Sequence, residues 1–379
     1  MNNIFDYLEW RGDLSFEKDG FNEVDNLIMS VLAYVEFDDI ASLSADGESV
    51  TIRSVAEQFK NLYDDISKVS EHQLTIAGFE LFMKAANTVR YSDIMLSNYV
   101  NQINYEESKQ FAAVMFSLDS NHHFIAFRGT DATIAGWEED FKMTFMDEVQ
   151  AQRDAVNYTK KVMTCHDGDF WFGGHSKGGN LAVYAAAYAS NEERKRILGV
   201  YNNDGPGFQA KIIQSEGYQS VLSRIKTIIP KSAVVGMLLE HGEEYAVVNS
   251  HAIGIMQHNP FSWEVKGNYF VYEKGLTKSS LNFNSVVRAW LNNLSIEERG
   301  QFVDALFQIL QAAGAKTLFE LSKERLKTID IMIKTFKNMD PVTKQILKQT
   351  VESLFVESEK IFKTALKPDK ILFFSRKKR

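Results

Sequence analysis

The chain has 379 residues, 45% hydrophobic and 24% charged, proportions that are ordinary for a globular protein. Its formal net charge of −8 gives no reason to expect nucleic-acid binding. Cys165 is the only cysteine, which excludes an internal disulfide and a four-thiolate metal site. No window approaches the ~20 apolar residues of a membrane span. The segment Met1–Asp6 lacks the pattern of a secretory signal, so we expect a cytoplasmic protein.

Residues 1–100 are predicted to form an N-terminal extension of largely helical character. Asn22–Ala33 and Ser54–Ser67 carry apolar side chains at helical spacing. Glycine and proline are sparse and charge is high, so we expect this part to pack on a core rather than to form one. No residue pattern within it suggests chemistry.

Residues 101–280 are predicted to form an α/β core with a mostly parallel sheet. Short apolar runs typical of strands alternate with helical patterns, among them Val149–Cys165, whose last residue we expect to be buried. The predicted strands are Phe111–Leu118, Phe124–Phe127, Phe170–Phe172, Ile197–Tyr201 and Ile225–Ile229, with Tyr245–Val248 and Tyr269–Tyr272 at the edge.

Residues 281–379 are predicted to form an all-helical C-terminal appendage. Ser295 and Glu298 have the spacing of a helix capping box. Residues 284–379 carry a net charge of +7, whereas the remainder carries −15. Two interpretations of the basic C-terminus stay open. It makes weak peripheral contact with an anionic membrane surface, or it is the frayed end of a solvated helical bundle.

The segment Gly174-His175-Ser176-Lys177-Gly178 is a G-x-S-x-G pentapeptide between a predicted strand and the helical pattern Asn180–Ala189. Composition alone gives roughly a tenth of a match per chain, so the pentapeptide is a weak signal without its context. Strand, tight turn and helix supply that context, because they place the serine hydroxyl at the carboxyl edge of the sheet. Ser176 is therefore the predicted nucleophile, and a purely structural turn is the alternative.

A serine nucleophile needs a base and an acid that orients the base. Asp204 follows the next predicted strand, at the correct edge of the sheet, although Asn203-Asp204-Gly205 also suits a turn aspartate. His258 is the preferred base, because Pro260 and neighbouring aromatic residues would hold its loop rigidly. His251 remains an alternative to His258, whereas His241 lies in a polar stretch and is expected to be solvated.

The oxyanion of an acyl-transfer intermediate needs two hydrogen-bond donors. We predict the backbone N–H of Lys177, which follows the nucleophile, and that of Thr130 in the turn after an earlier strand. An ordinary turn is the alternative for the second position. His175 is expected to pack within the elbow rather than to take part in catalysis. We predict no cofactor and no metal, since the adjacent His122 and His123 would face opposite sides of a strand.

Two groups of motifs resemble known families. The first is similar to the class 3 lipase-like branch of the α/β-hydrolases and comprises Phe127-Arg128-Gly129-Thr130, Trp137, Asp140 and Gly174–Gly179. The second resembles the bacterial Mbeg1-like family and comprises Asp6–Leu14, Asn22–Leu27, Asn203–Gly207 and Gln257–Trp263. The resemblance covers about residues 1–275 and implies an α/β-hydrolase core with a serine nucleophile; it does not explain the helical tail.

The chain departs from the lipase pattern at two positions. Lys177 stands where the lipases usually have leucine, and Ile229-Pro230-Lys231-Ser232 has no carboxylate where their acid is found, which leaves Asp204 as the substitute. The sequence predicts a lipase- or esterase-like serine hydrolase of small-molecule or lipid esters or thioesters. A catalytically silent α/β-hydrolase fold used for binding is the alternative.

Overall fold

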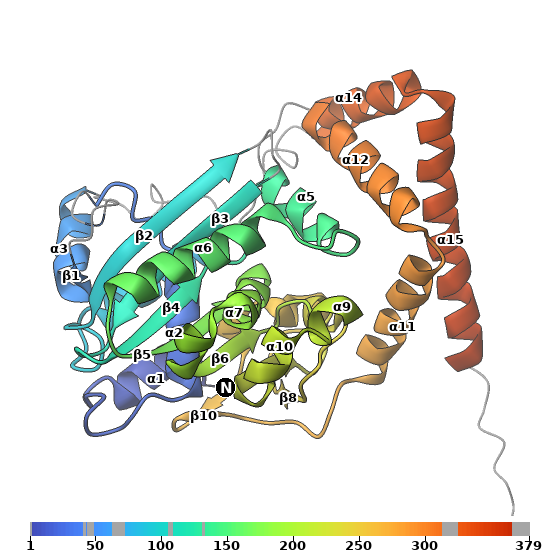
Figure 1. Cartoon of the computed structure of the whole chain (residues 1–379). Helices are drawn as coiled ribbons and strands as arrows, with labels where there is room; N and C mark the ends of the chain where they lie inside the picture. The colour runs from blue at the N-terminus through green and yellow to red at the C-terminus, as the bar shows by residue number, and fades with distance from the viewer. Residues whose placement is uncertain are drawn as a thin grey trace, which may run out of the picture.

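The computed structural model describes residues 2–40, 43, 49–62, 73–104, 109–130, 133–312 and 325–365. An eight-stranded sheet forms its centre, in the order β1-β2-β3-β4-β5-β6-β7-β8 (Figure 1). The strands are β1 (Val50–Thr51), β2 (Met95–Asn104), β3 (Lys109–Ser117), β4 (His122–Phe127), β5 (Asp169–His175), β6 (Ile197–Asn203), β7 (Ile225–Pro230) and β8 (Tyr245–Val248). The strands from β4 to β8 pair in parallel, whereas those from β1 to β4 pair antiparallel.

Helices cover both faces of this sheet. One face carries α1 (Ile4–Arg11), α2 (Glu23–Leu32), α3 (Ile52–Leu62) and α4 (Gln73–Ala85), and the other carries α6 (Gln150–Cys165), α7 (Lys177–Tyr188) and α10 (Glu216–Val221). The strand–turn–helix unit β5–α7 within a mostly parallel, helix-covered sheet is that of the α/β-hydrolase fold, as predicted. Shorter helices are α5 (Ile134–Lys142), α8 (Asn191–Lys195) and α9 (Ala210–Ile213).

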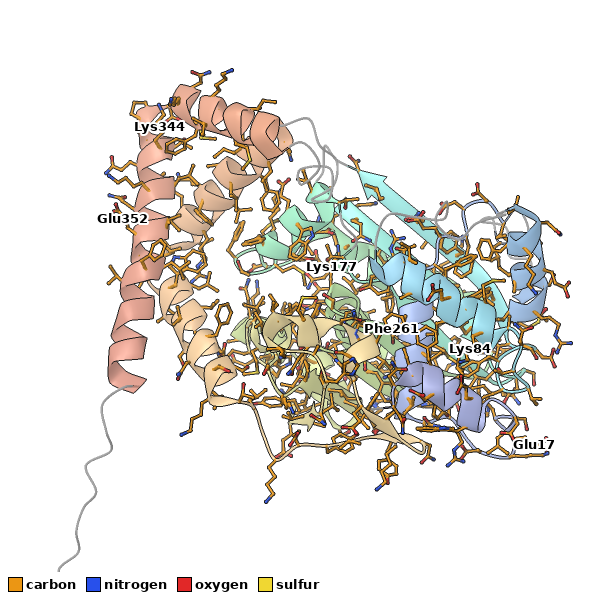
Figure 2. All side chains as sticks on the ribbon, turned by 180° about the vertical axis from the view of Figure 1, so that it is seen from behind. Glu17, Lys84, Lys177, Phe261, Lys344 and Glu352 are labelled. Carbon is orange, nitrogen blue, oxygen red and sulfur yellow. The ribbon has the colours of Figure 1, made fainter. Side chains whose placement is uncertain are left out.

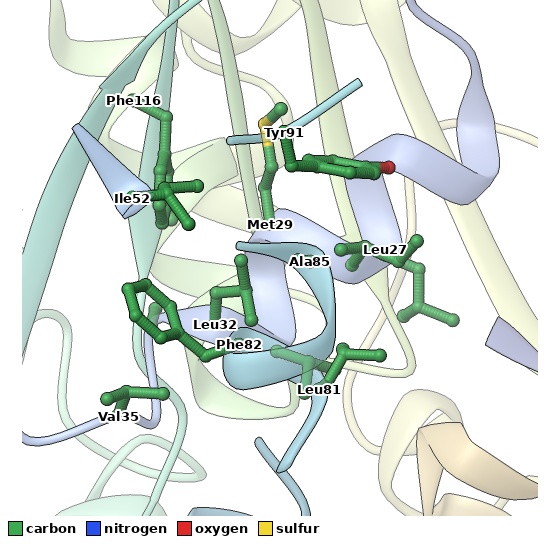
Figure 3. Close-up of a cluster of buried hydrophobic side chains, with 14 of the residues drawn as sticks. Leu27, Met29, Leu32, Val35, Ile52, Leu81, Phe82, Ala85, Tyr91 and Phe116 are labelled. Atoms are coloured by element: carbon green, nitrogen blue, oxygen red, sulfur yellow. The ribbon is translucent and has the colours of Figure 1, made fainter. Parts of the chain in front are cut away.

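Alternate side chains of β3 belong to two separate hydrophobic cores, as the two-residue period of a strand requires. Val114 and Phe116 pack with the N-terminal helices, whereas Ala113 and Met115 pack with α6 and α7. Figure 3 shows Phe116 in the first of these cores, together with side chains of α2 and α4. The N-terminal region therefore contributes a full layer of the core, and its residues 50–51 and 95–104 also supply strands of the sheet.

In the described part of the C-terminal region, the helices that follow the sheet are α11 (Lys278–Asn292), α12 (Ile296–Ala312), α14 (Arg325–Asn338) and α15 (Pro341–Ala365). The predicted capping box is present, since Ser295 and Glu298 each accept a hydrogen bond from the other's backbone N–H. Phe302 and Phe307 of α12 share an apolar cluster with Ile134 of α5. The basic C-terminus with its predicted membrane contact lies outside the described residues. None of the described helices is long and apolar enough to cross a bilayer.

Two expectations about the core are wrong. Tyr269–Tyr272 does not complete the main sheet, because β10 (Tyr269–Phe270) pairs with β9 (Val265–Lys266) in a separate hairpin that turns at Gly267 with φ +67°. Only Tyr272 reaches the main sheet, through an isolated bridge to Val248 of β8. Cys165 is exposed rather than buried, since it ends α6 at the surface.

Candidate active site

Ser176 occupies the sharp turn between β5 and α7. Its backbone has φ 58° and ψ −134°, a combination that costs energy for any residue with a side chain and is typical of a nucleophile elbow. The two flanking glycines are required by close packing. A Cβ on Gly174 would lie 2.2 Å from the carbonyl carbon of Gly178, and one on Gly178 would lie 2.1 Å from the carbonyl oxygen of Phe127.

The three predicted catalytic side chains meet at the carboxyl edge of the sheet. His258 Nε2 lies 3.0 Å from Ser176 Oγ, and His258 Nδ1 lies 2.7 Å from Asp204 Oδ2. A carboxylate accepts hydrogen bonds only, so Nδ1 carries the proton and Nε2 is free to accept the serine hydroxyl. Ser176 is 8% exposed and Asp204 is fully buried, while the side chain of His258 is 25% exposed.

Asp204 is held as a hydrogen-bond acceptor at both carboxylate oxygens. Its Oδ2 faces His258, and its Oδ1 accepts the N–H of Gly236 at 3.1 Å. Burial raises the pKa of Asp204 above its ordinary value, against the opposing effect of these contacts. The alternative prediction for Asp204 was that its side chain stabilises the turn. In the structure Asn202 makes this turn contact, because its Oδ1 accepts the N–H of Gly205.

The family model of the Mbeg1-like proteins matches residues 85–308, more than half of the chain, and the matched segment contains all three of these side chains. The chain belongs to the Mbeg1-like family. No curated protein matches the sequence. Among solved structures, the crystal structure of M37 lipase matches with 12% sequence identity and a TM-score of 0.33, over 56% of this chain and 68% of that chain.

In this Mbeg1-like chain a buried histidine of the elbow holds the loop of His258. His175 Nε2 lies 2.8 Å from the carbonyl oxygen of His258 and donates to it, so its Nδ1 accepts the hydroxyl of Tyr34 at 3.2 Å. Burial lowers the pKa of His175 well below its ordinary value, which keeps this imidazole neutral. His175 therefore packs in the elbow, as expected, and also orients the backbone of the candidate base.

The same loop is anchored to the N-terminus of the chain. Phe261, labelled in Figure 2, is buried and stacks on Phe5 with ring centroids 5.4 Å apart. The N–H of Val265 donates to the carbonyl oxygen of Asn2 at 2.9 Å. His251, the alternative base, is exposed and donates its backbone N–H to Ser262. The structure thus brings His258, and not His251, to the serine.

The two residues predicted to supply the oxyanion donors come directly after Ser176 and after Gly129, which packs against Ser176. Lys177 is the first residue of α7, where a backbone N–H has no acceptor within its own helix. A Cβ added to Gly129 would lie 3.1 Å from Ser176 Cβ, so the turn that leads to Thr130 passes directly by the nucleophile. The hydroxyl of Thr130 donates to Asp140, which fixes this turn on α5.

The lysine of the elbow forms a buried ion pair that the sequence did not predict. Lys177 Nζ lies 2.9 Å from Glu139 Oε2 of α5, and the two side chains are 1% and 2% exposed. Lys177 also donates to the carbonyl oxygen of Gln110, and Glu139 accepts the N–H groups of Gln110 and Ala151. Lys177 is labelled in Figure 2. This pair joins the start of α7 to α5.

A second unpredicted network lies under the elbow. Asn26 of α2 and Asn203 of β6 exchange amide hydrogen bonds at 2.9 and 3.2 Å, although 177 residues separate them. Asn203 also donates to the carbonyl oxygen of Gly174 at 3.0 Å. These contacts couple the N-terminal layer to the strand that carries Asp204.

Among the residues that the structure describes, no group of three or more His, Cys, Asp or Glu side chains is arranged to hold a metal ion.

Proposed function

We propose that this chain is a serine hydrolase that cleaves a carboxylic ester or thioester through an acyl-enzyme on Ser176. The observation that carries the proposal is the continuous hydrogen-bond chain from Ser176 through His258 to Asp204. Membership of the Mbeg1-like family and the α/β-hydrolase fold support it. A small-molecule or lipid ester is the proposed substrate.

In the first half of the reaction, Ser176 Oγ attacks the carbonyl carbon while His258 Nε2 takes the hydroxyl proton. Asp204 holds the tautomer of His258 that makes this transfer possible, and it stabilises the imidazolium that forms. The backbone N–H groups of Lys177 and Thr130 are the proposed donors to the tetrahedral oxyanion. His258 then protonates the leaving alcohol or thiol, and a water molecule activated by the same imidazole releases the acid.

Labelling with a fluorophosphonate probe tests this proposal, because the probe reacts only with an activated serine. We expect the full chain to be labelled and Ser176→Ala to be unlabelled, with both proteins equally folded by circular dichroism. Equal labelling of the two proteins would contradict the role of Ser176. A folded wild-type chain that is neither labelled nor active on esters would favour the alternative of a silent fold used for binding.

A matched pair of histidine variants tests the choice of base. His258→Gln should reduce the labelling rate at least ~10³-fold, since the amide cannot take a proton from Ser176. His251→Gln should leave the rate unchanged, because His251 is exposed and, among the described residues, its side chain makes no hydrogen bond to the triad. Rates would be measured by gel fluorescence over a time course. A larger loss in His251→Gln than in His258→Gln would reverse the assignment.

A further inference from the structure

His241 is buried beside the catalytic acid, contrary to the expectation that it is solvated. Its side chain is 6% exposed. Its Nε2 lies 2.7 Å from the carbonyl oxygen of Gly236, and its Nδ1 lies 3.2 Å from Glu243 Oε1. Gly236 is the residue whose N–H donates to Asp204 Oδ1. His241 and Glu243 therefore form a second histidine–carboxylate pair, which is connected to Asp204 through Gly236.

Both partners of His241 are acceptors. A carbonyl oxygen has no proton to donate, so Nε2 carries one. Burial favours the neutral form of Glu243, but hydrogen bonds from His241, Thr227 and Tyr218 outweigh it and lower the pKa of Glu243 to about 2. The imidazole is therefore held at both of its nitrogens, by the carbonyl oxygen of Gly236 and by the carboxylate of Glu243.

Gly236 is packed tightly against its neighbours. A Cβ at this position would lie 2.3 Å from Asp204 Oδ1 and 2.7 Å from a methyl carbon of Ile229. The backbone thus touches the carboxylate on one side, while its carbonyl oxygen is held by His241 on the other. Any shift of the imidazole would move the N–H that Asp204 depends on.

We propose that His241 is a positioning residue for the triad: held at Nδ1 by Glu243, it donates from Nε2 to the carbonyl oxygen of Gly236 and so fixes the N–H of Gly236 against Asp204. The inference rests on the proposed hydrolase function. It gives a role to a buried histidine that the reaction itself does not use.

Several other charged or titratable groups surround His241. The ring of Tyr245 from β8 lies 6.4 Å from the imidazole, centroid to centroid. Tyr218 from α10 reaches the same carboxylate, Glu243. Arg288 from α11 pairs with Glu240, the residue before His241.

The expected effect follows from these contacts. Without the hydrogen bond from His241, the N–H of Gly236 is held less firmly against Asp204. Asp204 then orients His258 less well for the transfer of the Ser176 proton. Because His241 lies behind the acid and not at the serine, kcat should fall by about tenfold, the loss typical of one hydrogen bond, with little change in KM.

The test compares ester-hydrolysis kinetics of the wild-type chain, His241→Gln and His241→Leu. Glutamine keeps a donor for the Gly236 carbonyl, whereas leucine has none. His241→Leu should lower kcat with little change in KM, and His241→Gln should recover most of the loss. Glu244→Gln, an exposed neighbour of Glu243, is the matched control and should leave kcat unchanged. Equal losses in His241→Gln and His241→Leu would mean a packing role only and would overturn the proposal.

A measurement without turnover separates this inference from the proposed function. In hydrogen-exchange NMR, the backbone N–H of Gly236 should be protected in the wild-type chain, and the protection should fall in His241→Leu but not in His241→Gln. Unchanged protection in His241→Leu would overturn the proposal even in an active enzyme. An inert wild-type chain whose Gly236 N–H loses protection in His241→Leu would instead refute the hydrolase function and leave the positioning contact standing.

Discussion

Asp204→Asn is expected to lower kcat/KM for ester hydrolysis by about 10³- to 10⁴-fold without unfolding the protein. Asparagine has the shape of aspartate, and its amide oxygen can still accept the N–H of Gly236. Its NH₂ group, however, would face His258 Nδ1 as a donor. The imidazole would then carry its proton on Nε2, where it cannot accept the hydroxyl proton of Ser176. Initial rates on a short-chain nitrophenyl ester, with thermal unfolding of both proteins, measure the effect.

The chain offers a matched control for this substitution. Asp119 also holds a histidine ring, with its Oδ2 2.8 Å from His122 Nδ1, but this pair is exposed and lies at the start of β4, away from the elbow. Asp119→Asn should leave kcat/KM unchanged. If Asp204→Asn kept activity within about tenfold of the wild type, Asp204 would not be the acid of a triad.

Lys177→Met should destabilise the folded chain by about 3–5 kcal/mol, the largest stability change that we expect from a single substitution near the site. The methionine fills the volume of the lysine stem, but Glu139 is left as an unpaired charge that is 2% exposed. Desolvation of that carboxylate, rather than loss of an attraction, is the main cost. Urea unfolding followed by tryptophan fluorescence gives the free energy directly.

Two further variants separate burial from charge pairing. Lys177→Met combined with Glu139→Gln should recover part of the lost stability, because a neutral amide is less costly to bury than a carboxylate. Lys211→Met breaks an ion pair with Asp147 that is exposed to solvent, and its effect should be too small to measure. Unchanged stability in Lys177→Met alone would show that the buried pair is not required for folding.

The parts of the site that are local in sequence could be predicted from it. The elbow is specified by about twenty consecutive residues, since a strand, two pairs of glycines around the serine and a helix follow one another from Asp169 to Tyr188. The position of Asp204 was predictable for a similar reason, because parallel strands end at the same edge of a sheet. The preference for His258 rested on a rigid loop, and the stacking of Phe261 on Phe5 provides that rigidity.

The parts that depend on distant partners could not be predicted. His241 lies among charged neighbours and has no apolar pattern around it, yet its side chain is buried against Glu243. Thr227 and Tyr218, from other elements, donate hydrogen bonds to that carboxylate. The hydrogen bond between Tyr34 and His175 joins residues 141 positions apart, and Lys177 forms its ion pair with Glu139 of another helix. No spacing rule within a single sequence encodes such pairs.

The link between the loop of the candidate base and the start of the chain has a consequence for biogenesis. Glu23 accepts the N–H of Phe270 across 247 residues, next to the contacts of Phe5 and Asn2 with the same region. A nascent chain presents its nucleophile and its acid long before it can order its base. Closing so large a loop is entropically costly and slow. We therefore expect the emerging polypeptide to lack the proposed activity until nearly the whole core has been made.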